Sequence, residues 1–163
     1  MARALLIGCG CRARELGGRL LAEGWRVRGT TRAAQGAAAI ERAGIEPAVA
    51  DPDRIGTVLD QIADVAVVGW LLGSASGDPG LLAALHGPRL ERLCEELVDT
   101  PVRGLVYEAA GSVAPESLRE GRRVLADASA RWHIPVELLD HDPADACGWA
   151  QAAEAAFARL VGL

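Results

Sequence analysis

Short apolar runs alternate along the chain with longer stretches in which apolar residues recur every three or four positions. Such runs are typical of buried strands, and the three-to-four-residue spacing is typical of helices with one buried face. The pattern predicts strands at Ala4–Ile7, Trp25–Gly29, Glu46–Ala50, Asp64–Trp70, Val102–Tyr107 and Val136–Leu139. It predicts helices at Arg12–Glu23, Ala33–Ala43, Asp53–Gln61, Arg89–Val98, Pro115–Trp132 and Ala144–Leu160, with a short helical turn at Leu81–Leu85.

This alternation of strands and helices predicts the fold class. Strands joined by helices form a parallel sheet covered on both faces, so we expect an α/β protein with a doubly wound, three-layer Rossmann fold and the strand order 3-2-1-4-5-6. Asp64–Trp70 is apolar on both faces and should be a central strand. Asp51 or Asp53 is the expected cap of the helix after the third strand. A length of 163 residues predicts one domain, residues 1–163, without a separate substrate domain.

Charge and hydropathy narrow the possible partners. The formal net charge is −5, the pI is about 5.2 and the arginines are scattered, so nucleic acid is not an expected partner. No apolar run approaches the roughly 20 residues that span a bilayer. Arg12 and Arg14 closely follow the first apolar segment, which is not the pattern of a signal peptide. We therefore expect a cytoplasmic protein with no membrane partner.

Cysteine, histidine and lysine usage limits the chemistry. Cys9 and Cys11 form a C-x-C pair, which is neither the redox spacing nor a zinc half-site, so the four cysteines are expected to be reduced thiols. The three histidines lie far apart, and we expect them at the surface or at element ends, with no metal site. All seventeen basic residues are arginine, so no lysine is available for a Schiff base or for acid catalysis.

The first predicted strand leads into the first helix through a glycine-containing turn. Gly8 and Gly10 allow the backbone to turn sharply and to approach a phosphate closely, and Ala13 at the usual place of a third glycine still allows close packing. The start of the helix directs free N–H groups and a partial positive charge at the same point. Any tight strand-to-helix turn favours glycine, but this position in the chain indicates a dinucleotide site, with Cys11 and Arg12 in the turn.

The end of the second strand indicates which dinucleotide is bound. NAD-dependent enzymes usually present an acidic side chain there to the ribose hydroxyls, whereas this chain has Thr30, Thr31 and Arg32. A guanidinium forks onto phosphate oxygens, so Arg32 suits the 2′-phosphate of NADP(H). A solvated arginine at a helix start is the alternative. We expect NADP(H) in preference to NAD(H).

These residues also carry a family resemblance. The runs Gly8–Arg32, Ala48–Arg54 and Val65–Ser74 resemble the N-terminal half of extended and atypical short-chain dehydrogenases/reductases, the NAD-dependent epimerase/dehydratase group. The resemblance implies that Asp51 hydrogen-bonds the adenine. It also implies that Gly69–Leu72 after the fourth strand, including Trp70 and Leu71, lines the adenine ribose and the nicotinamide side. Core packing is the alternative for Trp70.

The chain departs from that family in its turn and in its catalytic residues. Cys11, Arg12 and Ala13 replace the aromatic, aliphatic and glycine residues usual in the turn. Active members use a Tyr-x-x-x-Lys pair, which cannot form here because Tyr107 is the only tyrosine and there is no lysine. The C-terminal substrate domain of the extended members is also expected to be missing.

Acid catalysis would therefore need another group. Leu105–Val113 resembles the family's fifth strand, whose end carries a catalytic Ser or Thr in active members. Tyr107, Glu108 and Ser112 lie at that end, where open α/β sheets bind ligands, and they are the catalytic candidates. Glu108 could act as an acid if its pKa is raised, or simply cap a loop. His86 is either a proton donor or, as we expect, a surface residue.

A loop and two helices leave open questions about the cleft and the assembly. Gly73–Gly80 is the longest stretch of loop residues and is a candidate lid or cleft opening. Apolar faces on Arg89–Val98 and Pro115–Trp132 could form a homodimer contact or pack onto the sheet.

Three functions remain: a minimal NADP-dependent oxidoreductase acting on a small-molecule substrate, a non-catalytic NADP(H) sensor, or a scaffold that has lost the nucleotide.

Overall fold

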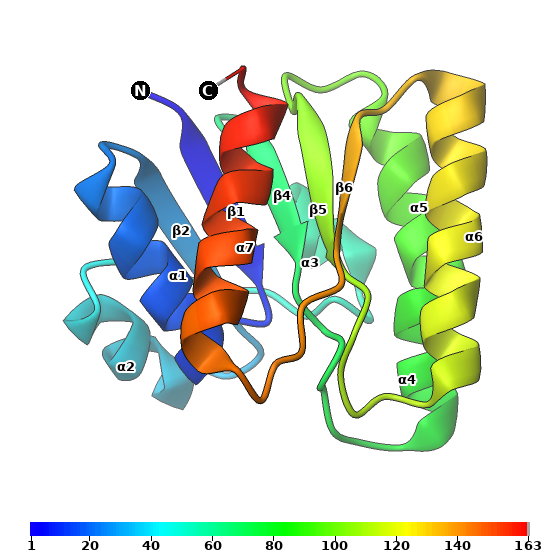
Figure 1. Cartoon of the computed structure of the whole chain (residues 1–163), viewed down its shortest axis with the longest axis horizontal. Helices are drawn as coiled ribbons and strands as arrows, with labels where there is room; N and C mark the ends of the chain where they lie inside the picture. Colours follow the sequence, from blue (N-terminus) through cyan, green and yellow to red (C-terminus); the bar gives the residue numbers. More distant parts are fainter. Residues whose placement is uncertain (163) are drawn as a thin grey trace.

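The computed structural model describes residues 1–162 and contains one six-stranded sheet with helices on both faces (Figure 1). All neighbouring strands are parallel, in the order β3-β2-β1-β4-β5-β6. The strands are β1 (Arg3–Ile7), β2 (Arg26–Thr31), β3 (Glu46–Val49), β4 (Val67–Trp70), β5 (Gly104–Glu108) and β6 (Val136–Leu139). The helices are α1 (Cys11–Ala22), α2 (Ala37–Arg42), α3 (Ile55–Leu59), α4 (Pro79–His86), α5 (Pro88–Leu97), α6 (Pro115–Trp132) and α7 (Ala146–Leu160), with a 3-10 turn, η1 (Ala34–Gly36), before α2. Leu163, the last residue of the expected domain, lies outside the described residues.

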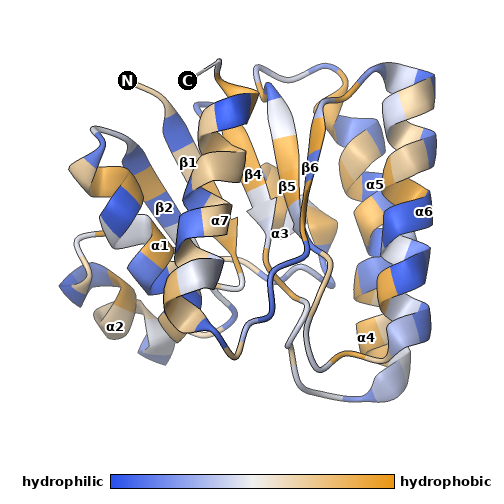
Figure 2. Ribbon diagram, viewed as in Figure 1, coloured by the Kyte–Doolittle hydropathy of each residue, from blue (hydrophilic) through white to orange (hydrophobic). Residues whose placement is uncertain are grey.

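The sheet separates two apolar cores. Helices α1, α2 and α7 cover one face, where Leu16, Ile40 and Phe157 are buried. Helices α3 to α6 cover the other face, where Val58 and Leu93 are buried. Figure 1 shows α1, α2 and α7 on the near side of the sheet. In Figure 2 the strands at the centre are largely hydrophobic, whereas hydrophilic and hydrophobic residues alternate along α6, as expected for a helix with one buried face.

The parallel sheet and its strand order confirm the prediction, and the differences are local. β4 is buried along its whole length between β1 and β5, as its apolar composition predicts. Helix α4 is longer than the short turn expected, because the Asp78 carboxylate accepts from the Leu81 N–H at 3.1 Å and Pro79 occupies the first turn. The expected cap of α3 was wrong: no side chain caps it, and Asp51 instead accepts from the Asp53 N–H at 2.9 Å in the preceding turn.

The apolar faces of α5 and α6 belong to the core. Leu90, Leu93 and Leu97 on α5 are buried, as are Val124 and Leu125 on α6. Of the two alternatives for these faces, packing onto the sheet is therefore correct. Within residues 1–162, no helix combines the length and the apolar character needed to cross a membrane.

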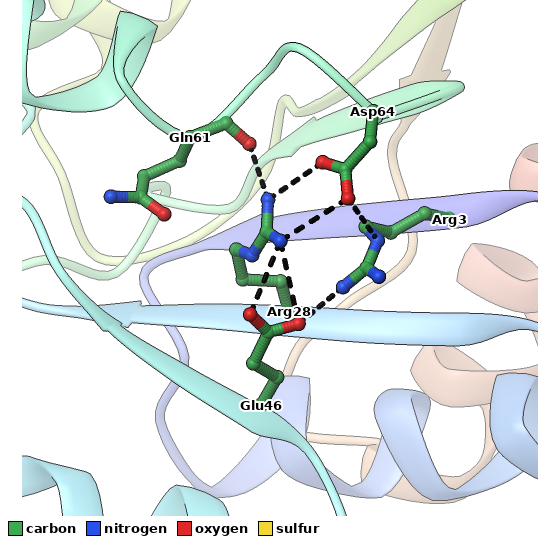
Figure 3. Close-up of polar contacts among 5 residues, drawn as sticks. All are labelled: Arg3, Arg28, Glu46, Gln61 and Asp64. Carbon is green, nitrogen blue, oxygen red and sulfur yellow. Dashed lines mark hydrogen bonds and ion pairs between the residues drawn. The ribbon is translucent and has the colours of Figure 1, made fainter.

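An ion-pair network joins β1, β2, β3 and the segment before β4 near the amino ends of these strands (Figure 3). Arg28 on β2 donates to Asp64 at 2.9 Å, to Glu46 at 3.1 Å and to the Gln61 carbonyl at 2.7 Å. Arg3 on β1 pairs with the same two carboxylates. The hydrogen bond from Arg28 lowers the pKa of Asp64. Burial alone would raise the pKa of Glu46, but its bonds to the two arginines hold that pKa below its ordinary value.

Candidate functional site

The turn between β1 and α1 places two glycines at the carboxyl edge of the sheet. Gly8 has a φ of +87°, and a Cβ there would lie 2.5 Å from the carbonyl oxygen of Leu71. The chain's own backbone therefore requires glycine at this position. Gly10 has an ordinary φ of −83°, and a Cβ there would meet no atom within 4 Å. The bare backbone of Gly10 thus borders open space that a ligand can approach closely.

Helix α1 begins directly after Gly10 and lacks a cap. No side chain within residues 1–162 bonds its first-turn N–H groups, and that turn contains no acidic residue. Twelve residues of aligned peptide dipoles give this end a partial positive charge. Arg12 lies in the first turn, and the Arg14 guanidinium donates to the Cys9 carbonyl at 3.3 Å. The turn therefore offers the N–H donors and the positive charge that a diphosphate requires.

A cavity of about 440 Å³ opens beside this turn. It is bounded by the carboxyl ends of β1 to β4 and by helix α4. Thr30, Thr31 and Arg32 at the end of β2 line it, as expected for the residues that follow the second strand. Ser74 and Ser76 line it as well, so the loop after β4 borders this cavity.

Positive charge dominates the wall of this cavity, which is called the larger cavity below. Arg12, Arg14 and Arg32 line it, and within residues 1–162 no Asp or Glu does. Arg32 is exposed, and none of the ion pairs in the described part of the chain involves it. Three arginines without a carboxylate, in a chain of net charge −5, make this cavity a local site for an anion.

Two residues expected beside the cofactor do not line this cavity. Trp70 is fully buried, and its indole N–H donates to the Leu85 carbonyl at 3.0 Å, so its side chain packs in the core. Asp51 stands outside the wall, although its neighbours Ala50 and Pro52 form part of it. The Asp51 carboxylate is already engaged in the turn that follows. The cavity thus presents backbone and apolar groups, and not this carboxylate, at the end of β3.

A second, smaller cavity of about 110 Å³ adjoins the same turn. It shares part of its wall with the larger cavity and extends to the end of β5 and the start of α7. Its wall is formed by Gly8, Gly10, Cys11, Arg12, Ala13, Leu71, Glu108 and Trp149. The turn therefore borders both cavities.

Glu108 is the carboxylate of the smaller cavity. Its side chain is buried, and Oε1 accepts from the Gly73 N–H at 2.7 Å, so Glu108 does cap a loop. Burial raises the pKa of Glu108 and outweighs the opposing effects of the Gly73 N–H and the nearby Arg12. Arg12 also lies over Trp149, with 5.7 Å between the guanidinium carbon and the ring centre.

Tyr107 is held away from both cavities. Its hydroxyl lies 2.6 Å from Nδ1 of His86, and Nε2 of His86 lies 3.1 Å from the Leu72 carbonyl oxygen. The carbonyl can only accept, so Nε2 carries the proton and Nδ1 accepts from the tyrosine hydroxyl. Both side chains are fully buried, and burial raises the pKa of Tyr107 and lowers that of His86. The expected surface position of His86 was wrong, because the longer α4 ends inside the core.

Ser112, a predicted site residue, lies outside both cavities, whereas Trp149, which was not predicted, lines one of them. Ser112 is exposed, its N–H donates to the Ser74 hydroxyl oxygen at 3.3 Å, and it lines neither cavity. Trp149, which is not among the residues predicted for the site, lines the smaller cavity from the first turn of α7. Sequence periodicity does not reveal this, because only the tertiary packing of α7 beside α1 brings Trp149 to the turn.

No family model and no curated protein matches this sequence. Solved structures match it in fold. A short-chain dehydrogenase/reductase superfamily protein from Agrobacterium tumefaciens with bound NAD is 17% identical, with a TM-score of 0.68 over 83% of this chain and 48% of that chain. UDP-glucuronic acid 4-epimerase from Bacillus cereus, in complex with NAD, is 15% identical, with a TM-score of 0.65 over 83% of this chain and 55% of that chain.

A third match is closer in length. BdcA from E. coli is 15% identical, with a TM-score of 0.72 over 96% of this chain and 93% of that chain. The present chain spans about half the length of the two larger proteins. At these identities the likeness concerns the fold alone. The chain therefore has the Rossmann-type fold found in structures of short-chain dehydrogenases/reductases and nucleotide-sugar epimerases.

Proposed function

We propose that this chain binds NADP(H) in the larger cavity. The observation that carries the proposal is the wall of that cavity, which combines the uncapped start of α1, the bare Gly10 backbone and three arginines with no acidic side chain from residues 1–162. A dinucleotide phosphate is the anion that fits a parallel sheet at this edge, at the point between β1 and β4 where the strand order reverses. NAD bound to two proteins of the same fold supports the class of ligand.

Different residues of the cavity contact different parts of the dinucleotide. The N–H groups that follow Gly10 hold the diphosphate, and Arg12 adds charge beside it. Arg32 pairs with the 2′-phosphate, assisted by the hydroxyls of Thr30 and Thr31. The adenine lies against the wall that Ala50 and Pro52 form at the end of β3, whereas Asp51, to which the resemblance assigns this contact, stands outside that wall. When bound, NADP(H) supplies a hydride donor or acceptor.

Calorimetric titration with NADPH, NADP+, NADH and NAD+ tests this proposal. We expect tighter binding of the two 2′-phosphorylated forms, and Arg32→Ala should remove that preference, which charge-assisted hydrogen bonds place at about 10- to 100-fold. Arg42→Ala is a matched control, because Arg42 is exposed at the end of α2 and lines neither cavity. Equal binding of all four nucleotides, or an unchanged preference in Arg32→Ala, would contradict the role of Arg32.

Two functions are compatible with this binding site. A non-catalytic NADP(H) sensor is favoured by Tyr107, whose hydroxyl is buried against His86 and has no lysine to activate it. A minimal oxidoreductase is favoured by Glu108, which is buried beside the turn with a raised pKa and could donate a proton. NADPH consumption with a panel of carbonyl compounds separates them. Turnover that is lost in Glu108→Gln supports the enzyme, and silence across the panel supports the sensor.

The remaining expectations belong to the same proposal. We propose one nucleotide-binding domain over residues 1–163, acting in the cytoplasm. The sequence leaves open whether the apolar faces of α5 and α6 form a homodimer contact or pack onto the sheet, and their apolar residues are used in the core. Sedimentation of the purified chain should therefore show a monomer.

A further inference from the structure

The smaller cavity contains polar groups that no described residue satisfies. Glu108 and Trp149 are each 1% exposed, yet Oε2 of Glu108 and Nε1 of Trp149 complete no hydrogen bond within residues 1–162, although the indole N–H lies close enough to the Glu108 carboxyl to oppose the rise in its pKa. Nε of Arg12 also lacks one. All three residues form the wall of this cavity. Buried polar atoms without partners are rare and destabilising, so three at one cavity indicate a ligand that satisfies them.

The local geometry fixes which atoms are available. The Gly73 N–H occupies Oε1 of Glu108, so Oε2 is the acceptor that remains when the carboxyl is ionised. The indole of Trp149 can only donate through Nε1, and Arg12 can only donate through its guanidinium. The cavity therefore offers one acceptor and two donors in a volume of about 110 Å³, which has room for a small planar group.

The chemistry of the missing partner follows from this count. A carboxylate would accept from Trp149 and Arg12 but would oppose the Glu108 carboxylate. A cation would satisfy Glu108 and leave both donors unpaired. A primary amide satisfies all three, since its carbonyl oxygen accepts two hydrogen bonds and its NH₂ donates to Oε2. We infer that the smaller cavity is a recognition site for a neutral primary carboxamide, with Glu108 as the residue that selects the amide over the corresponding acid.

Two sources of carboxamide fit the position of the site. The smaller cavity shares Gly8, Gly10, Arg12 and Leu71 with the larger one, so the amide of an NADP(H) molecule bound as proposed above is one source. That source rests on the proposed function. A separate small amide, bound without any dinucleotide, is the other source and does not depend on it.

Glu108→Gln tests this inference, because the substitution should reverse the binding preference between amide and acid. The Gly73 N–H still requires an acceptor, so the glutamine oxygen takes the place of Oε1 and its NH₂ takes the place of Oε2. The variant then presents a donor where the wild type presents an acceptor. An amide loses its partner, whereas a carboxylate gains one. Preference for amide over acid should therefore reverse.

The experiment uses two pairs of probes on the full chain at pH 8. Calorimetry compares NADP+ with its nicotinic acid analogue, and separately compares free nicotinamide with free nicotinic acid. We expect the wild type to prefer the amide by at least about tenfold in one pair or both, because mispaired buried polar groups discriminate strongly. In Glu108→Gln the acid should bind more tightly. Trp149→Phe should weaken the amide without favouring the acid, and it serves if Glu108→Gln does not fold.

The outcomes separate the inference from the proposed function. Glu116→Gln is the control, since Glu116 is exposed on α6 and lines neither cavity. Discrimination by free nicotinamide alone, without dinucleotide binding, supports a separate amide ligand and removes the NADP(H) proposal. Equal binding of amide and acid in both pairs, or the same preference in wild type and Glu108→Gln, overturns the inference and leaves NADP(H) binding untouched. No binding of any probe overturns both.

Discussion

Alanine substitutions at the two glycines of the β1–α1 turn should affect different properties. Gly8→Ala should lower the stability of the fold, and Gly10→Ala should lower the affinity for the nucleotide. In Gly8→Ala the new Cβ would stand 2.5 Å from the Leu71 carbonyl oxygen and 2.9 Å from Cδ2 of Leu72, at a φ of +87°. The left-handed backbone costs about 1–2 kcal/mol and the overpacking about 1–3 kcal/mol, so unfolding should become easier by about 2–5 kcal/mol. For a chain of this size that corresponds to a fall in Tm of roughly 10 °C.

Gly10→Ala is the matched variant. Its φ of −83° suits alanine and its Cβ meets no atom within 4 Å, so its stability should stay within about 0.5 kcal/mol of the wild type. The same methyl group would stand where the diphosphate approaches the backbone, and NADPH affinity should fall at least about tenfold. Thermal unfolding and calorimetry on both variants check these expectations. If Gly10→Ala bound NADPH as well as the wild type does, the nucleotide would not approach the backbone there.

Three further predictions concern polar groups outside the two cavities. Tyr107→Phe leaves Nδ1 of His86 without its donor in the core, so urea unfolding should show a loss of about 1–3 kcal/mol, and an unchanged midpoint would refute this hydrogen bond. Burial lowers the pKa of His86 below 6.5, so the folded state binds fewer protons than the unfolded state. The stability that this provides is present above pH 6.5 and should fall as the pH drops below that value. The Tm measured from pH 8 to 5 should therefore decline less in His86→Gln than in the wild type. Arg28 lowers the pKa values of Glu46 and Asp64, so the stability from this network is present above their ordinary pKa values and is lost as the pH falls through the lowered ones. Arg28→Gln should therefore destabilise the fold more at pH 7 than at pH 3. Equal destabilisation at the two pH values would contradict the coupling.

The sequence contains enough information for the sheet because the sheet depends on local patterns. Apolar runs such as that of β4 are long enough to identify each strand, and the alternation with helices leaves few topologies. The glycine-containing turn and Arg32 could be placed at the cavity for the same reason, since their positions depend on neighbouring elements. Arg14 went unnoticed, because only the course of the turn brings its guanidinium to the wall.

The rest of the site depends on contacts between distant segments. His86 is polar and follows a loop, which suggests exposure, but the Tyr107 hydroxyl satisfies it inside the core. Trp149 reaches the turn only because α7 returns across the sheet to pack beside α1. Glu108 could be named as a candidate from its strand end, whereas its single unpaired oxygen is a product of the Gly73 contact. Tertiary pairing of this kind has no periodic signature in the sequence.

A ¹⁵N-resolved NMR titration of the chain with NADPH tests most directly whether a dinucleotide sits on the β1–α1 turn. Saturation should shift the amide signals of Gly10, Cys11 and Ala13 at the start of α1, and NADPH but not NADH should shift the guanidinium signal of Arg32. If the turn amides stayed in place while nucleotide bound elsewhere, or if no signal moved at millimolar NADPH, the larger cavity would not be a dinucleotide site.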